Sequence, residues 1–224
     1  MKQTPINDSF NRELLALVEP DARCIVEVGC SSGALAREYL KVNPRCEYVG
    51  VEIDAAYAEV ARSACTRVVV GNIETMSDSQ FGALFPADCF IFADVLEHLY
   101  DPWALLKRMR PLCAASSTSI VACIPNAQHW SVQVRLNSGA FRYEDAGLLD
   151  RTHIRWFTRI TIGELFSSCG FRIVEGGGRV FEEPKGRDLV LMGIQALAEA
   201  SGVDPEKARE DAIPFQWIVR AVPE

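Results

Sequence analysis

The sequence predicts an α/β fold built on a seven-stranded, doubly wound and mostly parallel sheet. Short apolar runs alternate with amphipathic segments along most of the 224 residues, in a regular strand–helix order. The first apolar run ends in a glycine-containing turn, Gly29 to Gly33, that leads directly into a helix. The length suits one domain with a full core, so residues 1–224 are expected to form a single domain.

The first half is expected to hold three strands after an opening helix, within an N-terminal segment of residues 1–19. Asp8 or Ser9 suits the N-cap of that helix, at Phe10–Val18. Runs rich in Val and Ile fit strands buried on both faces of a parallel sheet. The elements expected next are strand Cys24–Val28, helix Ala34–Lys41, strand Tyr48–Val51, helix Ala55–Ser63, strand Arg67–Val70 and a connection through Gln80–Leu84.

The second half continues the pattern and ends with a strand pair. Pro102 suits the first turn of a helix, and Gly170 suits the end of another. Residues 182–214 are charged and helix-forming, at Leu189–Ala200 and Pro205–Asp211, and predict a helical insertion or lid before the last strand. The other expected elements are strand Cys89–Ala93, helix Trp103–Leu112, strand Ser119–Ile124, helix Ile160–Cys169, strand Phe171–Glu175 and strand Gln216–Ala221.

Composition excludes several classes of protein. The hydrophobic fraction of 49% and charged fraction of 24% are ordinary for a soluble globular protein. No apolar run has the length of a membrane span, and the first residues lack the apolar core of a signal peptide, so a cytoplasmic location is expected. A net charge of −7 argues against bulk binding to nucleic acid or an anionic membrane. The sequence leaves the oligomeric state open.

The turn after the first strand predicts a nucleoside site. Gly29 permits a sharp turn, and the start of the next helix favours a polar or anionic group. Glu52, at the end of the following strand, is placed to accept hydrogen bonds from ribose hydroxyls. A dinucleotide is disfavoured because Ser31 replaces the middle glycine of G-x-G-x-x-G. Glu27, two residues before the turn, would repel a pyrophosphate but suits a cationic ligand.

Three motifs resemble those of the class I S-adenosylmethionine-dependent methyltransferases. The run I-V-E-V-G-C-S-S-G at 25–33 resembles their motif I. The series A-D-V-L-E-H-L at 93–99, then Asp101-Pro102 and Pro125-Asn126, resembles motifs IV and V of one subgroup. That subgroup includes ubiquinone-biosynthesis O-methyltransferases and enzymes of bacterial sugar and polysaccharide modification. The resemblance covers about residues 20–180 and the final strand.

The resemblance implies a Rossmann-like methyltransferase fold, with the seventh strand antiparallel between the fifth and sixth. It also implies S-adenosyl-L-methionine as cofactor and S-adenosyl-L-homocysteine as product. Asn72 stands where aspartate is more usual, although an amide can still accept from an adenine amino group. The implied cofactor-binding residues are Glu27, Gly29, Cys30, Ser31, Gly33, Glu52, Ile53, Asn72, Ile73, Asp94 and Val95.

Residues 126–159 are expected to form the substrate region, because loops this long are usually functional. Together with residues 182–214 they are predicted to cover the acceptor pocket. The predicted substrate contacts are His129, Trp130, Tyr143, Arg151 and Arg155. The acceptor is predicted to be a small molecule or glycan precursor, because the D-R-T-H-x-R-x-F-T-R stretch at 150–159 is most similar to bacterial enzymes of that context.

Two mechanisms remain open for the acceptor. An alcohol needs a base, and His98 and His153, which lie inside the recognised motifs, are the predicted catalytic residues. The same loop also resembles small-RNA 2′-O-methyltransferases, which use magnesium. In that case Asp94, Glu97, His98 and His153 would bind Mg²⁺ or Mn²⁺, which would lower the pKa of the acceptor hydroxyl. The metal-free base is preferred.

The predicted function is therefore S-adenosylmethionine-dependent O-methylation of a sugar or glycan-precursor hydroxyl. One alternative is methylation of a small phenol, carboxylate or amine. Another is a non-catalytic cofactor-binding scaffold or regulatory protein, which would have no need of His98 and His153. A dehydrogenase is disfavoured by Ser31 and by the missing phosphate-type glycines.

Overall fold

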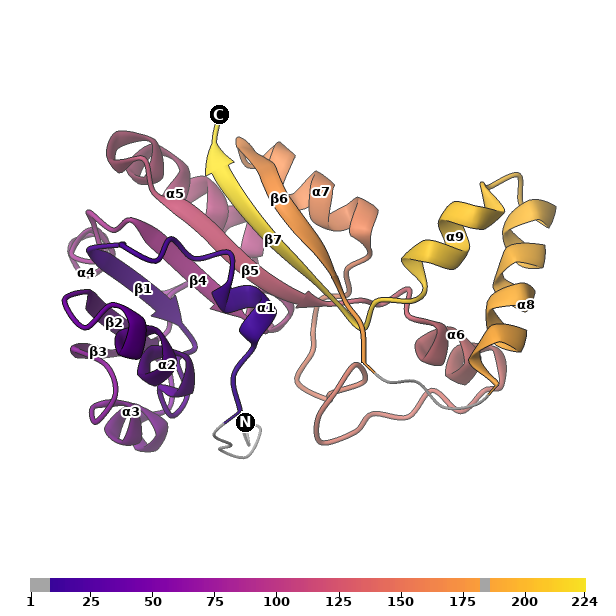
Figure 1. The fold of residues 1–224 in the computed structure, drawn as a ribbon, viewed down its shortest axis with the longest axis horizontal. Coiled ribbons are helices and arrows are strands. Elements are labelled where there is room, and N and C mark those ends of the chain that lie inside the picture. Colours follow the sequence, from indigo (N-terminus) through magenta and orange to yellow (C-terminus); the bar gives the residue numbers. More distant parts are fainter. Residues whose placement is uncertain (1–8, 182–185) are drawn as a thin grey trace.

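The computed structural model describes residues 9–181 and 186–224, and its centre is a seven-stranded sheet (Figure 1). The strand order is β3-β2-β1-β4-β5-β7-β6. The first five strands are parallel, and β7 runs antiparallel to both β5 and β6. This confirms the predicted fold class. The strands are β1 Cys24–Val28, β2 Glu47–Glu52, β3 Arg67–Val70, β4 Cys89–Ala93, β5 Ser119–Pro125, β6 Phe171–Arg179 and β7 Gln216–Pro223.

The strand order reverses between β1 and β4. The chain runs outward from β1 through β2 to β3, then returns to β4 on the other side of β1. In such sheets a ligand binds beyond the carboxyl ends of the strands at the point of reversal. Val28, Glu52 and Ala93 end β1, β2 and β4 at this edge, so the turns that follow them lie close together.

Alternating residues of the strands build two hydrophobic cores. Val26, Phe90 and Ile120 face one core, and their neighbours Ile25 and Ile91 face the other. The first core includes side chains of α4 Asp78–Gly82, α5 Pro102–Ser116 and α7 Arg159–Ser168. The second includes side chains of α1 Arg12–Leu15, α2 Ala34–Val42 and α3 Ala55–Ala61.

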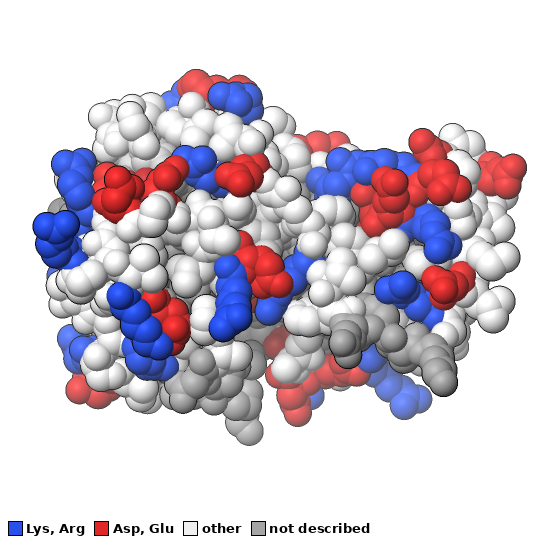
Figure 2. Space-filling view, viewed as in Figure 1, with Lys and Arg blue, Asp and Glu red and all other residues white. Residues whose placement is uncertain are grey.

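Three helices form a lobe beside the sheet (Figure 1). Helices α8 Arg187–Ala200 and α9 Pro205–Asp211 come from the predicted insertion, and α6 Trp130–Asn137 comes from the predicted substrate region. Leu191, Ile194 and Ala208 belong to a small core that is separate from the two cores of the sheet, and Trp130 packs against it. Within the described residues, every helix is too short or too polar to traverse a lipid bilayer. Acidic and basic side chains are interspersed over the face drawn in Figure 2.

Some element boundaries differ from the sequence prediction. The opening helix covers only Arg12–Leu15, and Asn11, rather than Ser9, caps it by accepting from the Leu14 N–H at 3.0 Å. Asp8 lies outside the described residues. Strand β6 continues past Glu175 to Arg179 through three glycines. A Cβ on Gly176 would lie 2.5 Å from the Ile218 carbonyl oxygen, so these glycines let β6 approach β7 closely.

Candidate functional site

A pocket of about 700 Å³ lies beyond the carboxyl ends of β1, β2, β3 and β4. It brings together residues that the sequence separates by more than one hundred positions, including Gly29 and His153. The predicted site residues that line it are Gly29, Ser31, Glu52, Ile53, Asn72, Ile73, Asp94, Val95, Glu97, His98 and His153. Glu27 and Cys30 line a second pocket of about 250 Å³ instead, which shares Gly29, Ser31, Ala93 and Asp94 with the first.

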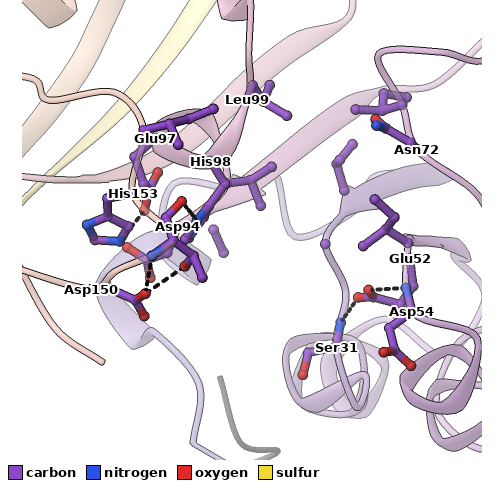
Figure 3. Close-up of a pocket in the computed structure, with 18 of the residues that line it drawn as sticks. Ser31, Glu52, Asp54, Asn72, Asp94, Glu97, His98, Leu99, Asp150 and His153 are labelled. Atoms are coloured by element: carbon purple, nitrogen blue, oxygen red, sulfur yellow. Dashed lines mark hydrogen bonds and ion pairs between the residues drawn. The ribbon is translucent and has the colours of Figure 1, made fainter. Parts of the chain in front are cut away.

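Glu52 is held in one orientation by the backbone of two turns (Figure 3). Its Oε2 accepts from the Ser31 N–H at 2.9 Å, and its Oε1 accepts from the Asp54 N–H at 3.0 Å. The N–H of Ser31 therefore binds the protein's own carboxylate rather than a ligand. These two backbone hydrogen bonds fix the orientation of the Glu52 carboxylate. This geometry suits recognition of a diol.

The turn that carries Ser31 depends on glycine at its first position. Gly29 has a φ of +71°, in the left-handed region. A Cβ there would lie 2.7 Å from Cγ2 of Val95, which itself lines the pocket. Gly33 has a φ of +74°, and its Cβ would lie 2.7 Å from that of Ala64. The backbone therefore passes close to the β4 turn at Gly29 and to the segment that follows α3 at Gly33, which lines neither pocket.

The third strand contributes Asn72 and Ile73. The Asn72 Oδ1 accepts from the Glu74 N–H at 2.9 Å, which fixes the side chain in a turn. Glu74 in turn accepts from the Tyr100 and Asp101 N–H groups, at 3.2 and 2.8 Å, and so links this turn to the segment after β4. Sequence reasoning did not include Glu74 or Tyr100, which both line the pocket.

Two histidines meet at the opposite end of the pocket (Figure 3). His98 belongs to a short 3₁₀ helix, η1 Leu96–His98, and His153 to the loop before α7. Their ring centroids lie 4.8 Å apart. The Nδ1 of His98 lies 3.1 Å from the Thr152 carbonyl oxygen, and that of His153 lies 3.1 Å from the Leu148 carbonyl oxygen. Because a carbonyl can only accept, each Nδ1 carries the proton and each neutral ring keeps its lone pair on Nε2.

Glu97 lies buried beside the two imidazoles. It is 1% exposed, and neither carboxylate oxygen has a hydrogen-bond partner among the described residues. Burial, followed by the charge of Asp94, raises the pKa of Glu97 well above its ordinary value. The backbone carbonyl of Glu97 accepts from the N–H groups of Ile154 and Arg155, both at 3.0 Å, and thereby attaches the loop to η1.

The loop histidine stays neutral more readily than an ordinary histidine. Burial, followed by the nearby His98, lowers the pKa of His153. Its Nε2 lies 3.9 Å from Oε1 of Glu97. Asp150 accepts from both the N–H and the hydroxyl of Thr152, at 2.8 and 2.6 Å. Although burial raises the pKa of Asp150, these hydrogen bonds outweigh it, and the pKa lies below its ordinary value.

Three of the four candidate metal ligands come together. Ligand atoms of Glu97, His98 and His153 all lie within 4.8 Å of one another. Asp94 is not in this group. Its Oδ1 accepts from the Gln216 side chain at 2.6 Å, and burial raises its pKa to about 6.

The five predicted substrate contacts lie elsewhere in the loop region. His129 is buried and caps α6, Trp130 packs on the lobe, and Tyr143 is 60% exposed. Arg151 pairs with Asp145 at 2.6 Å, and Arg155 donates to the Tyr100 carbonyl. None of the five lines the pocket, and neither does any described residue from 186 to 214. Their role as substrate contacts stays a prediction.

Other residues of the same region reach the pocket. Gly147, Asp150, Thr152 and Ile154 line it from the loop. Phe215 and Gln216 line it from the start of β7, and sequence reasoning missed both. A polar glutamine at the first position of an apolar final strand was the available signal.

Comparisons with known proteins agree with the fold. A family model described as a methyltransferase domain matches residues 5–176. No curated protein matches significantly. The plantazolicin methyltransferase BpumL, solved with S-adenosylhomocysteine, is 13% identical, with a TM-score of 0.56 over 91% of this chain and 76% of that one.

Two further solved structures are similar. A Haloferax volcanii protein solved with the Trm112 methyltransferase activator is 13% identical, with a TM-score of 0.59 over 94% of this chain and 87% of that one. The O-methyltransferase NcsB1 of neocarzinostatin biosynthesis, solved with S-adenosylmethionine and a naphthoic acid, is 14% identical. Its TM-score is 0.55 over 94% of this chain and 50% of that one. At these identities the likeness establishes the fold alone.

Proposed function

The chain belongs to the methyltransferase domain family, and we propose that it uses S-adenosyl-L-methionine to methylate a hydroxyl oxygen of a sugar or glycan precursor. One observation carries the proposal. A single pocket has an oriented carboxylate, Glu52, at one end and the Nε2 atoms of His98 and His153 at the other. A nucleoside held at the first end therefore shares its pocket with a base.

The donor groups of the pocket fit that cofactor. Glu52 suits the two ribose hydroxyls, while Asn72 and Ile73 offer an amide and an apolar side chain to the adenine. BpumL and NcsB1, which share the fold, were solved with S-adenosylhomocysteine and S-adenosylmethionine. When bound, the cofactor supplies a methyl group on a sulfonium, whose transfer depends on alignment with the acceptor oxygen.

The charges of the pocket favour a neutral acceptor. Its described lining residues include no lysine or arginine. They do include six carboxylates, namely Glu52, Asp54, Glu74, Asp94, Glu97 and Asp150. A phosphate or carboxylate on the acceptor would meet acidic side chains there and no lysine or arginine to bind it. Arg135 of α6 and Arg159 of α7 pair with carboxylates outside the pocket, with Glu144 at 2.5 Å and with Asp211 at 2.8 Å. An uncharged hydroxyl is the best match.

The histidines supply the proton acceptor that an alcohol needs. His153 Nε2 takes the hydroxyl proton as the oxygen attacks, and its neutral state is favoured by its lowered pKa. His98 stands next to it, with its own Nδ1 fixed by the Thr152 carbonyl. Such a base contributes roughly 10²–10⁴-fold to a rate.

A metal-assisted version of the reaction is the second candidate, and the buried Glu97 favours it. Both oxygens of this side chain lack hydrogen-bond partners among the described residues. One of them and a ring nitrogen of each imidazole all lie within 4.8 Å of one another. Oxygen and imidazole ligands suit Mg²⁺ or Mn²⁺ better than thiolate-preferring ions. Chelation separates the two versions. A plain base keeps its activity in EDTA, whereas the metal-assisted enzyme loses it and regains it with added Mg²⁺ or Mn²⁺.

The proposal is tested by methyl transfer to a panel of acceptors. With labelled S-adenosylmethionine, neutral sugars should be methylated, while matched sugar phosphates and carboxylates should be poor acceptors. A phenol and an amine belong in the panel as rival acceptor classes. If the protein binds the cofactor but transfers its methyl group to none of these, a non-catalytic cofactor-binding role replaces the proposal.

A further inference from the structure

The smaller of the two pockets is lined by segments that the sequence did not predict to lie together. It is formed by residues 9–11, the turn after β1, the start of α2, the end of β4 and Arg179 at the end of β6. Gly29, Ser31, Ala93 and Asp94 line both pockets. The two cavities are therefore neighbours that share one wall, and a single extended ligand can reach from one into the other.

The smaller pocket holds an acidic and a basic side chain, although burial raises the pKa of the acid, Glu27, well above its ordinary value. Glu27 is buried on one wall, where its carboxylate accepts from the Tyr48 hydroxyl at 2.9 Å. Arg179 is the one lysine or arginine among its described lining residues. A carboxylate and a guanidinium on the walls of one small cavity match an amino acid, which presents an ammonium and a carboxylate together.

Several contacts hold Arg179 at this position. Its Nη1 donates to the Gln216 side-chain oxygen at 3.0 Å, and the Gln216 amide donates to Asp94 at 2.6 Å. Its guanidinium carbon lies 4.6 Å from the ring centroid of Phe181. Nε lies 3.4 Å from Glu13 in an ion pair but makes no hydrogen bond within the described structure. With five N–H donors in a planar fork, the guanidinium can keep these contacts and bind a further carboxylate.

We propose that Arg179 binds the α-carboxylate of the cofactor's methionine end, with Glu27 facing its α-ammonium. This rests on the proposed function, because the nucleoside must occupy the larger pocket at Glu52. The cofactor's methionine arm then passes Gly29 and Asp94, which are among the residues that the two pockets share. Arg179 lies 150 positions after Gly29 in the sequence, so the motif-I turn alone does not indicate it as a ligand contact.

The test compares two ligands that differ only at the amino-acid end. S-adenosylhomocysteine contains the amino acid, whereas 5′-methylthioadenosine keeps the nucleoside and sulfur and lacks it. In calorimetric titrations of the full chain, Arg179→Gln should lower the affinity for S-adenosylhomocysteine by ~10-fold or more, because a charge-assisted pair is lost. Its affinity for 5′-methylthioadenosine should equal that of the wild type. Arg179→Lys should be intermediate, since it keeps the charge without the fork.

A matched control is available on the neighbouring strand. Arg220 of β7 is also partly buried and pairs with Glu19 at 2.7 Å, but it lines neither pocket. Arg220→Gln should leave both affinities unchanged. The assignment of Arg179 is wrong if Arg179→Gln keeps wild-type affinity for S-adenosylhomocysteine. It is also wrong if the variant loses affinity for S-adenosylhomocysteine and 5′-methylthioadenosine by the same factor. If the wild type binds neither ligand, the proposed function itself fails.

Discussion

The two imidazoles at the end of the pocket obtain their reactive tautomer from backbone carbonyls. Thr152 and Leu148 each present a carbonyl oxygen to an Nδ1, so no acidic side chain is needed to orient either ring. Glu97, whose Oε1 lies 3.9 Å from His153 Nε2, is buried and has a raised pKa. It therefore serves the site either as a neutral neighbour or, with an ion bound, as a ligand.

Replacing the loop histidine should separate catalysis from binding. His153→Ala is expected to lower kcat by roughly 10²–10⁴-fold, because the acceptor proton loses its base. Affinity for S-adenosylhomocysteine should stay within about twofold, since the proposed nucleoside site at Glu52 lies at the other end of the pocket. Steady-state kinetics and calorimetry measure the two effects. Wild-type turnover in this variant would return His153 to a purely structural role.

The pH dependence has a definite sign. A base must be unprotonated, so the rate should fall as pH drops through the pKa of His153. Burial and His98 lower that pKa, so the fall should have its midpoint below the ordinary histidine value of about 6.5. A kcat–pH profile from 5 to 8 measures it. A midpoint well above 6.5 would contradict the environment found for His153.

The turn between β1 and α2 is the element that most constrains the site. Gly29→Ala is expected to destabilise the protein by ~2–4 kcal/mol, through strain at positive φ and a clash with Val95. Gly202 provides a matched control. It has the same φ of +71°, but its Cβ would meet nothing within 4 Å. Gly202→Ala should therefore lower the free energy of unfolding by only ~1 kcal/mol, from the backbone strain at positive φ. Equal losses in chemical denaturation would show that the contact with Val95 does not matter.

The elements show what a sequence can and cannot predict. Strands β1, β2, β4 and β5 are apolar runs buried on both faces, so their composition identifies them. Helix α6 was missed because it has only eight residues, two of them β-branched valines. The helix is supported by a local cap, His129, and by the tertiary packing of Trp130 on the lobe core. The end of β6 was missed because three consecutive glycines, such as Gly176 to Gly178, usually indicate a turn rather than a strand.

The same distinction applies to the candidate site. Gly29, Glu52, His98 and His153 could be predicted, because each follows a recognisable strand or motif and the carboxyl ends of parallel strands converge. The contacts of Arg151 and Arg155 could not be predicted from the sequence. Whether a loop arginine turns to a ligand, to Asp145 or to the Tyr100 carbonyl depends on the folded path of the loop.

In the molecule as a whole, one buried amide joins the lobe to the sheet. The Asn126 Nδ2 donates to the carbonyl oxygens of Asp211 and Pro214, both at 2.8 Å. Asn126→Asp would aim a carboxylate at those oxygens and should cost ~3 kcal/mol or more in unfolding free energy. Asn137→Asp, on the exposed face of α6, should change stability by less than about 0.5 kcal/mol. Equal effects in thermal unfolding would contradict this role of Asn126.

The proposed activity requires that a nucleoside cofactor occupy the pocket at the carboxyl edge of the sheet. Calorimetric titration of the full chain with S-adenosyl-L-methionine tests this most directly. The titration should show one binding site per chain. Glu52→Ala should lower its affinity for S-adenosyl-L-methionine by ~100-fold, since two charge-assisted hydrogen bonds to the ribose are lost. Glu47→Ala, at the exposed opposite end of β2, should bind as the wild type does. Tight binding of NAD with none of S-adenosyl-L-methionine would contradict the proposal.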